Sequence, residues 1–424
     1  MREVLRKEIE LHRYCLQFEK ESFKHDRWKG WRYFLFQEAD AALLEAGLIV
    51  GISQREYQVQ HGGKVNGAIL EESLIPQMIG QFIGPVGDLN ELTINGWRRW
   101  KASKKELSPG KAKKKALRLQ KEITTQIEDF KKYLGSRKFS SPVEEKYFMA
   151  EARILEDIDI IIWHQFSRTF VTVERDWYTQ NSFYVLDIAK NITGALGNLV
   201  GIVAIRQKRP RMNVGANILT TTSGSFIMAN PLLSRGIGLL SSKYKRRGLG
   251  LVDKKASKQK VEDLKNQVQA LRAFKLGLQG DKYFQTEERV TAYIGQLGLL
   301  TDHLTREEAE DQKAYTAALG RVSVGALAGG TKVASGVTGI IASDPFARKP
   351  KKAGPLLLGG TIAYSTGTAI TLVDNLKIET KREMKYRKER KDGVLPGQIL
   401  DNEIEKLQEI EQHMAKPAAQ NKSP

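Results

Sequence analysis

Cysteine and histidine are scarce in this sequence. A single cysteine, Cys15, and six histidines are present among 424 residues. One cysteine excludes an internal disulfide framework, and neither this cysteine nor the scattered histidines have the close spacing of zinc ligands. We therefore expect no metal site.

Catalytic motifs are equally scarce. No serine, threonine or cysteine stands in a recognisable nucleophile motif. The nearest approach to a phosphate-binding loop, residues 325–332, has its lysine displaced by one position and no strand before it. Asp157, Asp159 and His164 could meet on one helix face, but the second Glu-x-x-His motif of a di-metal bundle is missing. We expect no catalytic residues, no cofactor, no small-molecule substrate and no enzymatic activity.

Acidic residues are too few to balance the basic ones. The chain has 49 Asp and Glu against 68 Lys and Arg, a formal net charge of +19. This excess favours a polyanionic partner, either an anionic lipid surface or nucleic acid. The first ten residues are charged throughout and carry no apolar core, so we expect no secretory signal there.

Long hydrophobic runs are few and not rich in leucine. Four stretches are nearly free of charge, namely 191–205, 212–234, 333–343 and 353–373. Only the last has the length of about 20 residues that crosses the hydrocarbon core of a bilayer. All four are dense in Gly, Ser and Thr, which lowers their hydrophobicity. They favour membrane insertion over the alternative of a soluble bundle with a tight core.

Glycines recur on single helical stripes within these stretches. Because glycine costs a helix up to about 1 kcal/mol relative to alanine, a glycine stripe favours close approach of another backbone. We predict two antiparallel helical hairpins, 183–234 and 315–376, that pack through such stripes. The predicted packing residues are Gly194, Gly197, Gly201, Gly325, Gly329, Gly336 and Gly339.

The remaining pattern is helical, so the predicted fold is all-α with long amphipathic helices. Ser141 and Pro142 mark a helix start, and apolar residues then recur at helical spacing with no proline before Pro210. Such a helix is on the order of 90 Å long and must run along partners or enter a second medium. Thr305 and Glu308 resemble a capping box and predict a second start.

Internal similarity predicts a tandem repeat. Residues 146–154 resemble 282–290, and a basic connector, a charge-poor stretch and an amphipathic helix follow each in the same order. We therefore divide the chain into repeat units 136–280 and 281–415. The first 135 residues form an N-terminal helical region that fits a degenerate third copy, and 416–424 are expected to be a disordered tail.

Basic and aromatic clusters border the apolar stretches. The two hairpin connectors are basic, and we expect them to bind an anionic surface through Arg206, Lys208, Arg209, Arg211, Arg348, Lys349, Lys351 and Lys352. Tryptophans alternate with basic residues beside two other apolar runs. This favours interfacial anchors over stacking platforms for single-stranded nucleic acid. The predicted anchors are Trp28, Trp31, Trp97 and Trp100.

Together these patterns predict a non-enzymatic helical membrane protein that acts as a scaffold, tether or assembly component. Leu400, Ile404 and Leu407 form a coiled-coil-like seam, which predicts self-association through the C-terminal helix. The greater charge in 243–260 and 377–391 places the termini in the cytoplasm. Two alternatives stay open: a pore-forming or translocated effector that inserts its hairpins, and a soluble basic nucleic-acid-binding protein.

Overall fold

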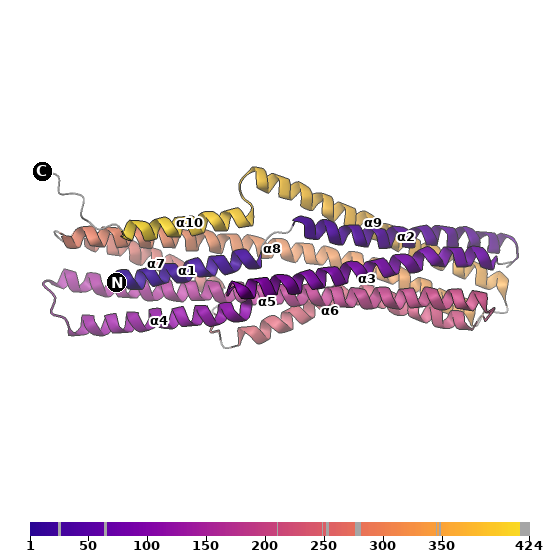
Figure 1. Ribbon diagram of the computed structural model, residues 1–424, viewed down its shortest axis with the longest axis horizontal. Coiled ribbons are helices and arrows are strands. Elements are labelled where there is room, and N and C mark those ends of the chain that lie inside the picture. Colours follow the sequence, from indigo (N-terminus) through magenta and orange to yellow (C-terminus); the bar gives the residue numbers. More distant parts are fainter. Residues whose placement is uncertain are drawn as a thin grey trace.

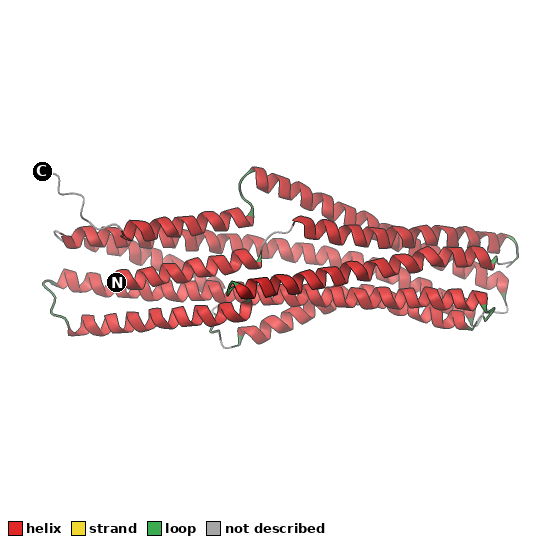
Figure 2. Ribbon diagram, in the orientation of Figure 1, coloured by secondary structure: helices red, strands yellow, loops and turns green. Residues whose placement is uncertain are grey.

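The computed structural model is 92% helical, and the residues that it describes include no strand (Figures 1 and 2), which confirms the all-α fold class. The described residues are 1–23, 27–62, 66–209, 211–247, 249–251, 254–275, 281–344, 346 and 349–415. Side chains are not described at 27–29, 254–255, 274–275, 281–285, 308–321, 350 and 415. The helices are α1 (Arg2–Ser22), α2 (Arg27–Gln60), α3 (Gly67–Lys104), α4 (Pro109–Ser136), α5 (Pro142–Arg206), α6 (Met212–Arg246), α7 (Lys254–Lys275), α8 (Asp281–Ser343), α9 (Pro350–Lys391) and α10 (Pro396–Ala415).

The helices form two bundles placed end to end along one long axis (Figure 1). In the first bundle α1, α4, α7 and α10 surround the N-terminal halves of α5 and α8. In the second, α2, α3, α6 and α9 pack with the C-terminal halves of α5 and α8. At 1.5 Å per residue, the 65 residues of α5 extend about 100 Å, so this helix passes through both bundles.

The start of α5 follows directly from its sequence. Ser141 accepts a hydrogen bond from the backbone N–H of Glu144 at 3.2 Å, and the Glu144 carboxylate accepts one from the N–H of Ser140 at 3.1 Å. Pro142 occupies the first turn, where its missing N–H leaves no bond unmade. The second predicted start is wrong: α8 runs without a break through Thr305, whose hydroxyl donates to the carbonyl of Thr301 at 3.0 Å.

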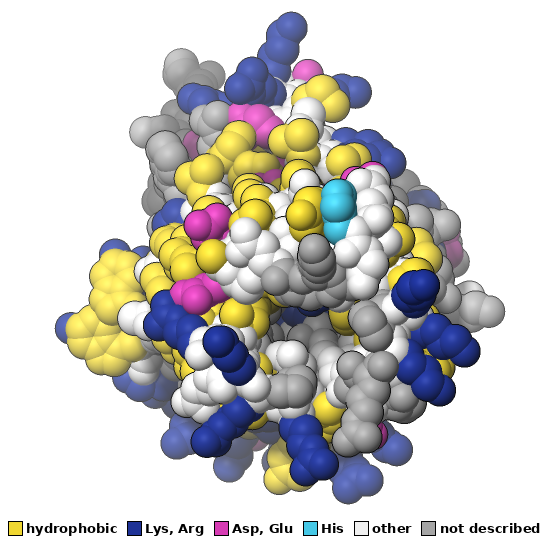
Figure 3. All heavy atoms as spheres, turned by 90° about the vertical axis from the view of Figure 1, so that its right-hand side faces the viewer, with side chains coloured by type: hydrophobic (Ala, Val, Ile, Leu, Met, Phe, Trp, Pro, Cys, Tyr) yellow, Lys and Arg dark blue, Asp and Glu magenta, His cyan; other side chains and the backbone are white. Residues whose placement is uncertain are grey.

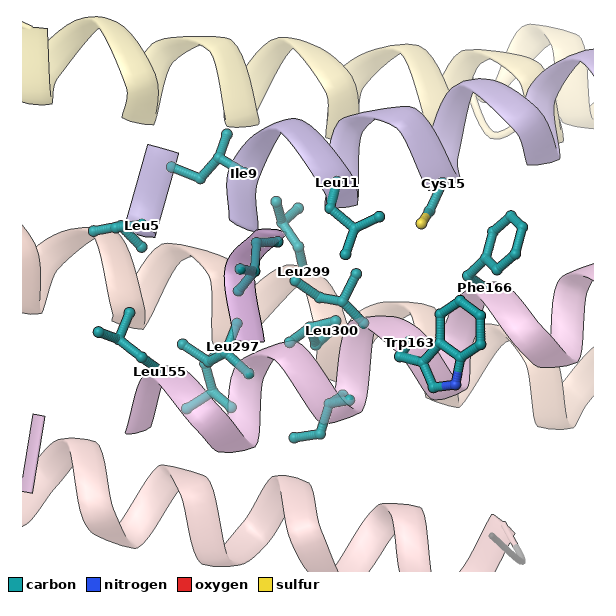
Figure 4. Close-up of a cluster of buried hydrophobic side chains, with 14 of the residues drawn as sticks. Leu5, Ile9, Leu11, Cys15, Leu155, Trp163, Phe166, Leu297, Leu299 and Leu300 are labelled. Carbon is teal, nitrogen blue, oxygen red and sulfur yellow. The ribbon is translucent and has the colours of Figure 1, made fainter. Parts of the chain in front are cut away.

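One hydrophobic core fills the first bundle. Its members come from α1, α4, α5, α7, α8 and α10, and Figure 4 shows Leu5, Ile9 and Phe166 facing this interior. The apolar seams of α7 and α10 are part of it. The seam residues Val261, Leu264, Val268, Leu271, Leu400, Leu407 and Met414 are buried within the chain. Self-association through α10 stays a prediction, although its seam already has a partner in α1 and α8.

The order of helices along the axis repeats three times. Each of 1–135, 136–280 and 281–415 begins in the first bundle, enters the second, turns back at the far end and returns (Figure 1). Each segment therefore contributes two helical stretches to the first bundle and two to the second. Duplication of the sequence stays a prediction, and the predicted tail at 416–424 lies outside the described residues.

The core of the first bundle also contains a buried ion pair. Glu151 accepts hydrogen bonds from the Arg289 guanidinium at 2.5 and 3.2 Å and from the Tyr293 hydroxyl at 3.0 Å. Both charged side chains are buried, so each depends on the other for compensation.

We expect Arg289→Met to lower the free energy of unfolding by about 3 to 5 kcal/mol, because it leaves the Glu151 carboxylate buried without a cation. Chemical denaturation of the detergent-solubilised chain, followed by circular dichroism, measures this change. The double variant Arg289→Met with Glu151→Leu should recover most of the loss. The exposed pair Lys132–Asp129 supplies the control, and Lys132→Met should have no measurable effect. Equal losses for Arg289→Met and Lys132→Met would contradict the account.

His12 is another buried titratable group of this core. It is fully buried in α1, and burial lowers the pKa of its imidazole to about 4 from the usual 6.5. The unfolded chain therefore binds a proton near pH 6.5, whereas the folded chain binds it only near pH 4. The resulting stability is complete above pH 6.5 and is lost as the pH falls toward 4.

We expect the contribution of His12 to the free energy of unfolding to fall by about 3 kcal/mol between pH 6.5 and 4. The difference in unfolding free energy between the wild type and His12→Leu isolates this contribution, because other titrating groups cancel. His413→Gln, which removes an exposed imidazole from α10, is the control variant. A difference for His12→Leu that is flat with pH would show that the imidazole is hydrated in the folded state.

Candidate membrane domain and its polar interior

The six helices of the second bundle form a closed ring. Each of them packs against two neighbours, in the circular order α2, α3, α5, α6, α8, α9 and back to α2. Successive helices of the ring run in opposite directions, because the chain turns at the far end between α2 and α3, α5 and α6, and α8 and α9 (Figure 1). A ring of this kind encloses an axis to which all six helices contribute side chains.

The interior of this ring is polar. On α3 the buried positions recur at intervals of three and four residues, as in a coiled-coil seam, but they carry polar residues and small ones. They are Gln77, Gln81, Gly84, Asp88, Glu91 and Asn95. The facing stripe of α5 has the same character, with Asp187, Asn191, Gly194, Asn198 and Gly201. No described residue of α2, α3, α6 or α9 belongs to the hydrophobic core of the protein.

The exterior of the same ring is apolar. On α6 the exposed side chains extend from Ile218 through Leu232 to Leu240, and the last of these is 68% exposed. Leu240 follows Ile218 by 22 positions, which corresponds to about 33 Å of helix and is close to the thickness of about 30 Å of a hydrocarbon core. Exposed apolar side chains on α3, α5, α8 and α9 continue this belt. They include Ile79, Phe82, Val86, Leu196, Leu199, Leu327, Val337, Ile362, Ile370 and Val373.

Three ranges of the described chain are long and apolar enough to cross a membrane: Pro142–Arg206, Val322–Ser343 and Lys351–Met414. Their most apolar windows have a mean hydropathy of 1.3 to 1.5, yet only 22% to 39% of the window residues are buried inside the protein. The apolar side chains therefore face outward. By length and composition, the chain is compatible with a helical membrane protein.

The glycines predicted to pack lie where helices of the ring meet. Gly194 and Gly201 face the Gln81 and Leu74 side chains of α3, and Gly197 faces the Ala216 carbonyl of α6. Those of α8 face α6, which belongs to the other hairpin. Their nearest neighbours there are Pro231 for Gly325, Met228 and Gly224 for Gly329, Thr221 for Gly336 and Asn217 for Gly339. The close approach along α8 thus joins two hairpins, whereas we expected it within one.

Some close contacts had no counterpart in the sequence analysis. A Cβ on Gly224 would lie 2.8 Å from the backbone N of Val333, and one on Gly360 would lie 3.3 Å from the Cα of Ser335. The seven-residue spacing between Gly360 and Gly367 is the signal that would have identified the α9 stripe.

Basic side chains surround the far end of the ring, which is the face shown in Figure 3. The connector residues Lys208, Arg209, Arg211, Lys349, Lys351 and Lys352 are exposed there, and Arg348 lies outside the described residues. Arg206 is exposed as well, and it pairs with Glu71 of α3, its Nε donating at 2.9 Å.

Aromatic and basic residues meet again at the junction of the two bundles. Trp97 and Trp100 are 56% and 55% exposed, and the ammonium groups of Lys101 and Lys104 lie over their rings at 5.3 and 3.8 Å. Trp31 is half-buried near the start of α2, and the side chain of Trp28 lies outside the described residues. An exposed tryptophan with a cation above it suits a bilayer interface.

Buried ion pairs hold this junction together. Glu174 of α5 is 1% exposed and pairs with Arg99 of α3 at 2.6 Å and with Lys245 of α6 at 3.0 Å. The Arg99 guanidinium also lies 4.3 Å from the centre of the Trp177 ring. The three helices are therefore tied together where α5 leaves the hydrophobic core.

Asp157, Asp159 and His164, which the sequence places on one helix, do not form a site. Asp157 accepts a hydrogen bond from Gln267 of α7, whereas Asp159 faces Thr124 of α4. His164 is buried, and burial lowers the pKa of its imidazole, with Lys260 and Arg168 adding to the effect. Among the described residues no group of three His, Cys, Asp or Glu side chains is arranged to hold a metal ion.

Comparisons of the chain with protein-family models, with curated proteins and with solved structures found no significant match.

We expect Gly336→Ala to destabilise the ring, because the added Cβ would lie 2.8 Å from the backbone N of Thr221 and 2.9 Å from the carbonyl of Asn217. Overpacking of this kind costs about 1 to 3 kcal/mol. Gly330 is the matched control, since a Cβ there meets nothing within 4 Å in the same helix. Thermal unfolding in detergent should show a lower midpoint for Gly336→Ala and an equal or higher one for Gly330→Ala. Equal midpoints for both variants would mean that α6 and α8 separate in the folded protein.

Proposed function

We propose that the protein is a non-enzymatic membrane scaffold, in which the six-helix ring lies in the bilayer and the first bundle stands outside it. The observation that carries this proposal is the reversal of polarity along α5 and α8. The same two helices pass from a bundle with an apolar interior to a ring with a polar interior and an apolar exterior. Water suits the first arrangement, and a hydrocarbon phase suits the second.

The rigidity of the connection supports a scaffolding role. Two continuous helices and the buried ion pairs around Glu174 link the bundles. A partner bound to the first bundle would therefore have a fixed orientation relative to the membrane. The exposed basic residues at the far end of the ring then lie at the opposite surface. We propose anionic lipid headgroups as their partners, at about 1 kcal/mol for each basic residue near the surface.

The two alternatives receive less support. A soluble nucleic-acid-binding protein would leave the apolar belt of the ring in water, which is unfavourable by about 25 cal/mol for each Å² of apolar area. A pore-forming effector needs a soluble state in which its hairpins are covered. The described helices of the first bundle fill their own core and do not cover the ring.

Cysteine labelling tests whether the ring spans the membrane. Starting from Cys15→Ala, one variant receives its single cysteine at the far end of the ring, Lys208→Cys, and the other receives it in the first bundle, Lys132→Cys. We expect a membrane-impermeant maleimide added to intact cells to label Lys208→Cys at once and Lys132→Cys only after permeabilisation, because we propose that the termini and the first bundle lie in the cytoplasm. The chain should also stay in the membrane pellet after alkaline carbonate.

Each other outcome has a defined meaning. Labelling of both cysteines from one side would show that the hairpins enter and leave the same leaflet. Labelling in the opposite order would overturn the orientation and keep the spanning ring. Complete release by carbonate would overturn the membrane scaffold itself.

A further inference from the structure

A cavity with titratable and amide side chains in its lining lies between the helices of the ring at mid-depth. The cavity has a volume of about 90 Å³, and its lining includes residues from all six helices of the ring. Two of them, Lys332 and Tyr364, stand near the centres of apolar spans. Lys332 is ten residues after the start of Val322–Ser343 and eleven before its end, and Tyr364 is in the middle of the charge-free stretch 353–373.

The charged groups of this cavity are not all paired. Lys332 is 3% exposed, and within the described part of the chain no carboxylate lies within ion-pair distance of its ammonium, which faces the Tyr364 ring at 5.0 Å. Asp40 of α2 is 6% exposed, and its Oδ1 is buried without a hydrogen-bond partner among the described residues. An unpaired ammonium and an unpaired carboxylate oxygen are costly in the middle of a bilayer, so such groups mark ion or proton pathways.

Charged groups of both signs face Asp40 from the neighbouring helices. On α5 these are Asp187 and Lys190, which pair with each other at 2.8 Å, and on α8 it is Lys332. Asp88 of α3 lies beside Asp187, while α9 contributes the Tyr364 hydroxyl and α6 lines the cavity with Ile227. The two lysines, Lys190 and Lys332, would repel a metal cation. The three carboxylates, those of Asp40, Asp88 and Asp187, would repel a simple anion. Groups of both signs that gain and lose protons suit proton transfer.

Polar side chains continue the cavity in both directions. Toward the far end, Asn198 donates to Gln81 at 3.1 Å, and Gln81 donates to the Tyr364 hydroxyl at 3.3 Å. Toward the junction, Glu91 pairs with Arg32 at 3.2 Å, and Asn95 donates to Asn181 at 3.1 Å. The polar stripe of α3 from Gln77 to Asn95 is about 27 Å long, nearly the full thickness of about 30 Å of a hydrocarbon core.

We propose that the ring conducts protons across the membrane along this polar interior, with Asp40 and Lys332 as the groups that exchange protons at mid-depth. A proton that enters from one side converts the Asp40 carboxylate to the acid, and the same proton leaves toward the other side and restores the carboxylate. Lys332 can release its proton to cavity water and regain one in the same way, so neither group changes after a full passage. The cavity is large enough to hold water, which would relay protons between these groups.

The inference rests on the membrane location proposed above, and the two can fail separately. A chain that stays in the membrane after carbonate but moves no protons would overturn the proton pathway alone. A chain that is released by carbonate would overturn both.

Proton flux into liposomes tests the proposal. The full-length chain is reconstituted into phosphatidylcholine vesicles that contain a pH-sensitive dye, and a potassium gradient with valinomycin supplies the driving potential. We expect the internal pH to change at least fivefold faster than in protein-free vesicles. Asp40→Asn and Lys332→Met should each reduce the rate to within twofold of protein-free vesicles. Asp344→Asn and Lys132→Met, which change an exposed connector residue and an exposed residue of the first bundle, should keep the wild-type rate.

Three results would overturn the proposal. The first is a wild-type rate equal to that of empty vesicles, with incorporation shown by flotation. The second is a wild-type rate in both cavity variants while their thermal midpoints stay within those of the two controls. The third is escape of a trapped dye such as calcein from wild-type vesicles, which would indicate a water-filled pore. If a single variant fails to fold, the comparison is made with Asp40→Glu, which keeps the carboxylate and should keep the flux.

Discussion

The structure depends on one constraint: α5 and α8 continue without a break from a bundle that hides apolar side chains to a ring that hides polar ones. A helix satisfies its own backbone hydrogen bonds, so it can cross between water and hydrocarbon at no cost to its main chain. Only the polarity of the inward-facing side chains has to change. On α5 this change occurs near Glu174, where apolar core contacts end and buried ion pairs begin. The remaining described helices are divided between the two bundles that α5 and α8 connect.

The closed ring explains how a polar interior can be stable. Because every helix has a neighbour on both sides, the carboxamides, carboxylates and lysines of α2, α3, α5 and α8 face one another and not the exterior of the ring. Glycines such as Gly224 and Gly336 allow the backbones of α6 and α8 to approach closely. In the membrane location that we propose, close packing and polar contacts replace the hydrophobic effect, which gives no driving force between helices in lipid.

Much of the helical architecture could be predicted from the sequence. The N-cap at Ser141 and the uninterrupted apolar period after it gave the long helix, and the basic connectors gave the turns at the far end. The false start at Thr305 arose because a capping pattern is local, whereas helix continuity there is decided by packing on both sides of the residue. The all-α class needed only periodicity.

The ring itself could not be predicted from the sequence, because its buried positions carry polar residues, whereas buried positions are usually recognised by apolar residues. Gln77, Gln81, Asp88, Glu91 and Asn95 have the spacing of a buried seam, but a search for apolar seams passes over them. Helices α2, α3 and α6 are not among the three candidate spans, and each of them buries polar side chains, such as Asp40, Gln81 and Asn230. Which helices close the ring depends on contacts between residues far apart in sequence, such as Gln81 with Tyr364.

The central claim is that the two bundles lie in different media. It is tested most directly by photocrosslinking the reconstituted chain with a phospholipid that carries a diazirine in the middle of an acyl chain, followed by mapping of the labelled peptides. The account predicts label on the outward faces of the ring, including peptides with Leu232 and Ile362, and none on α4 or on α5 before Phe170. Label in both bundles, or in neither, would contradict it.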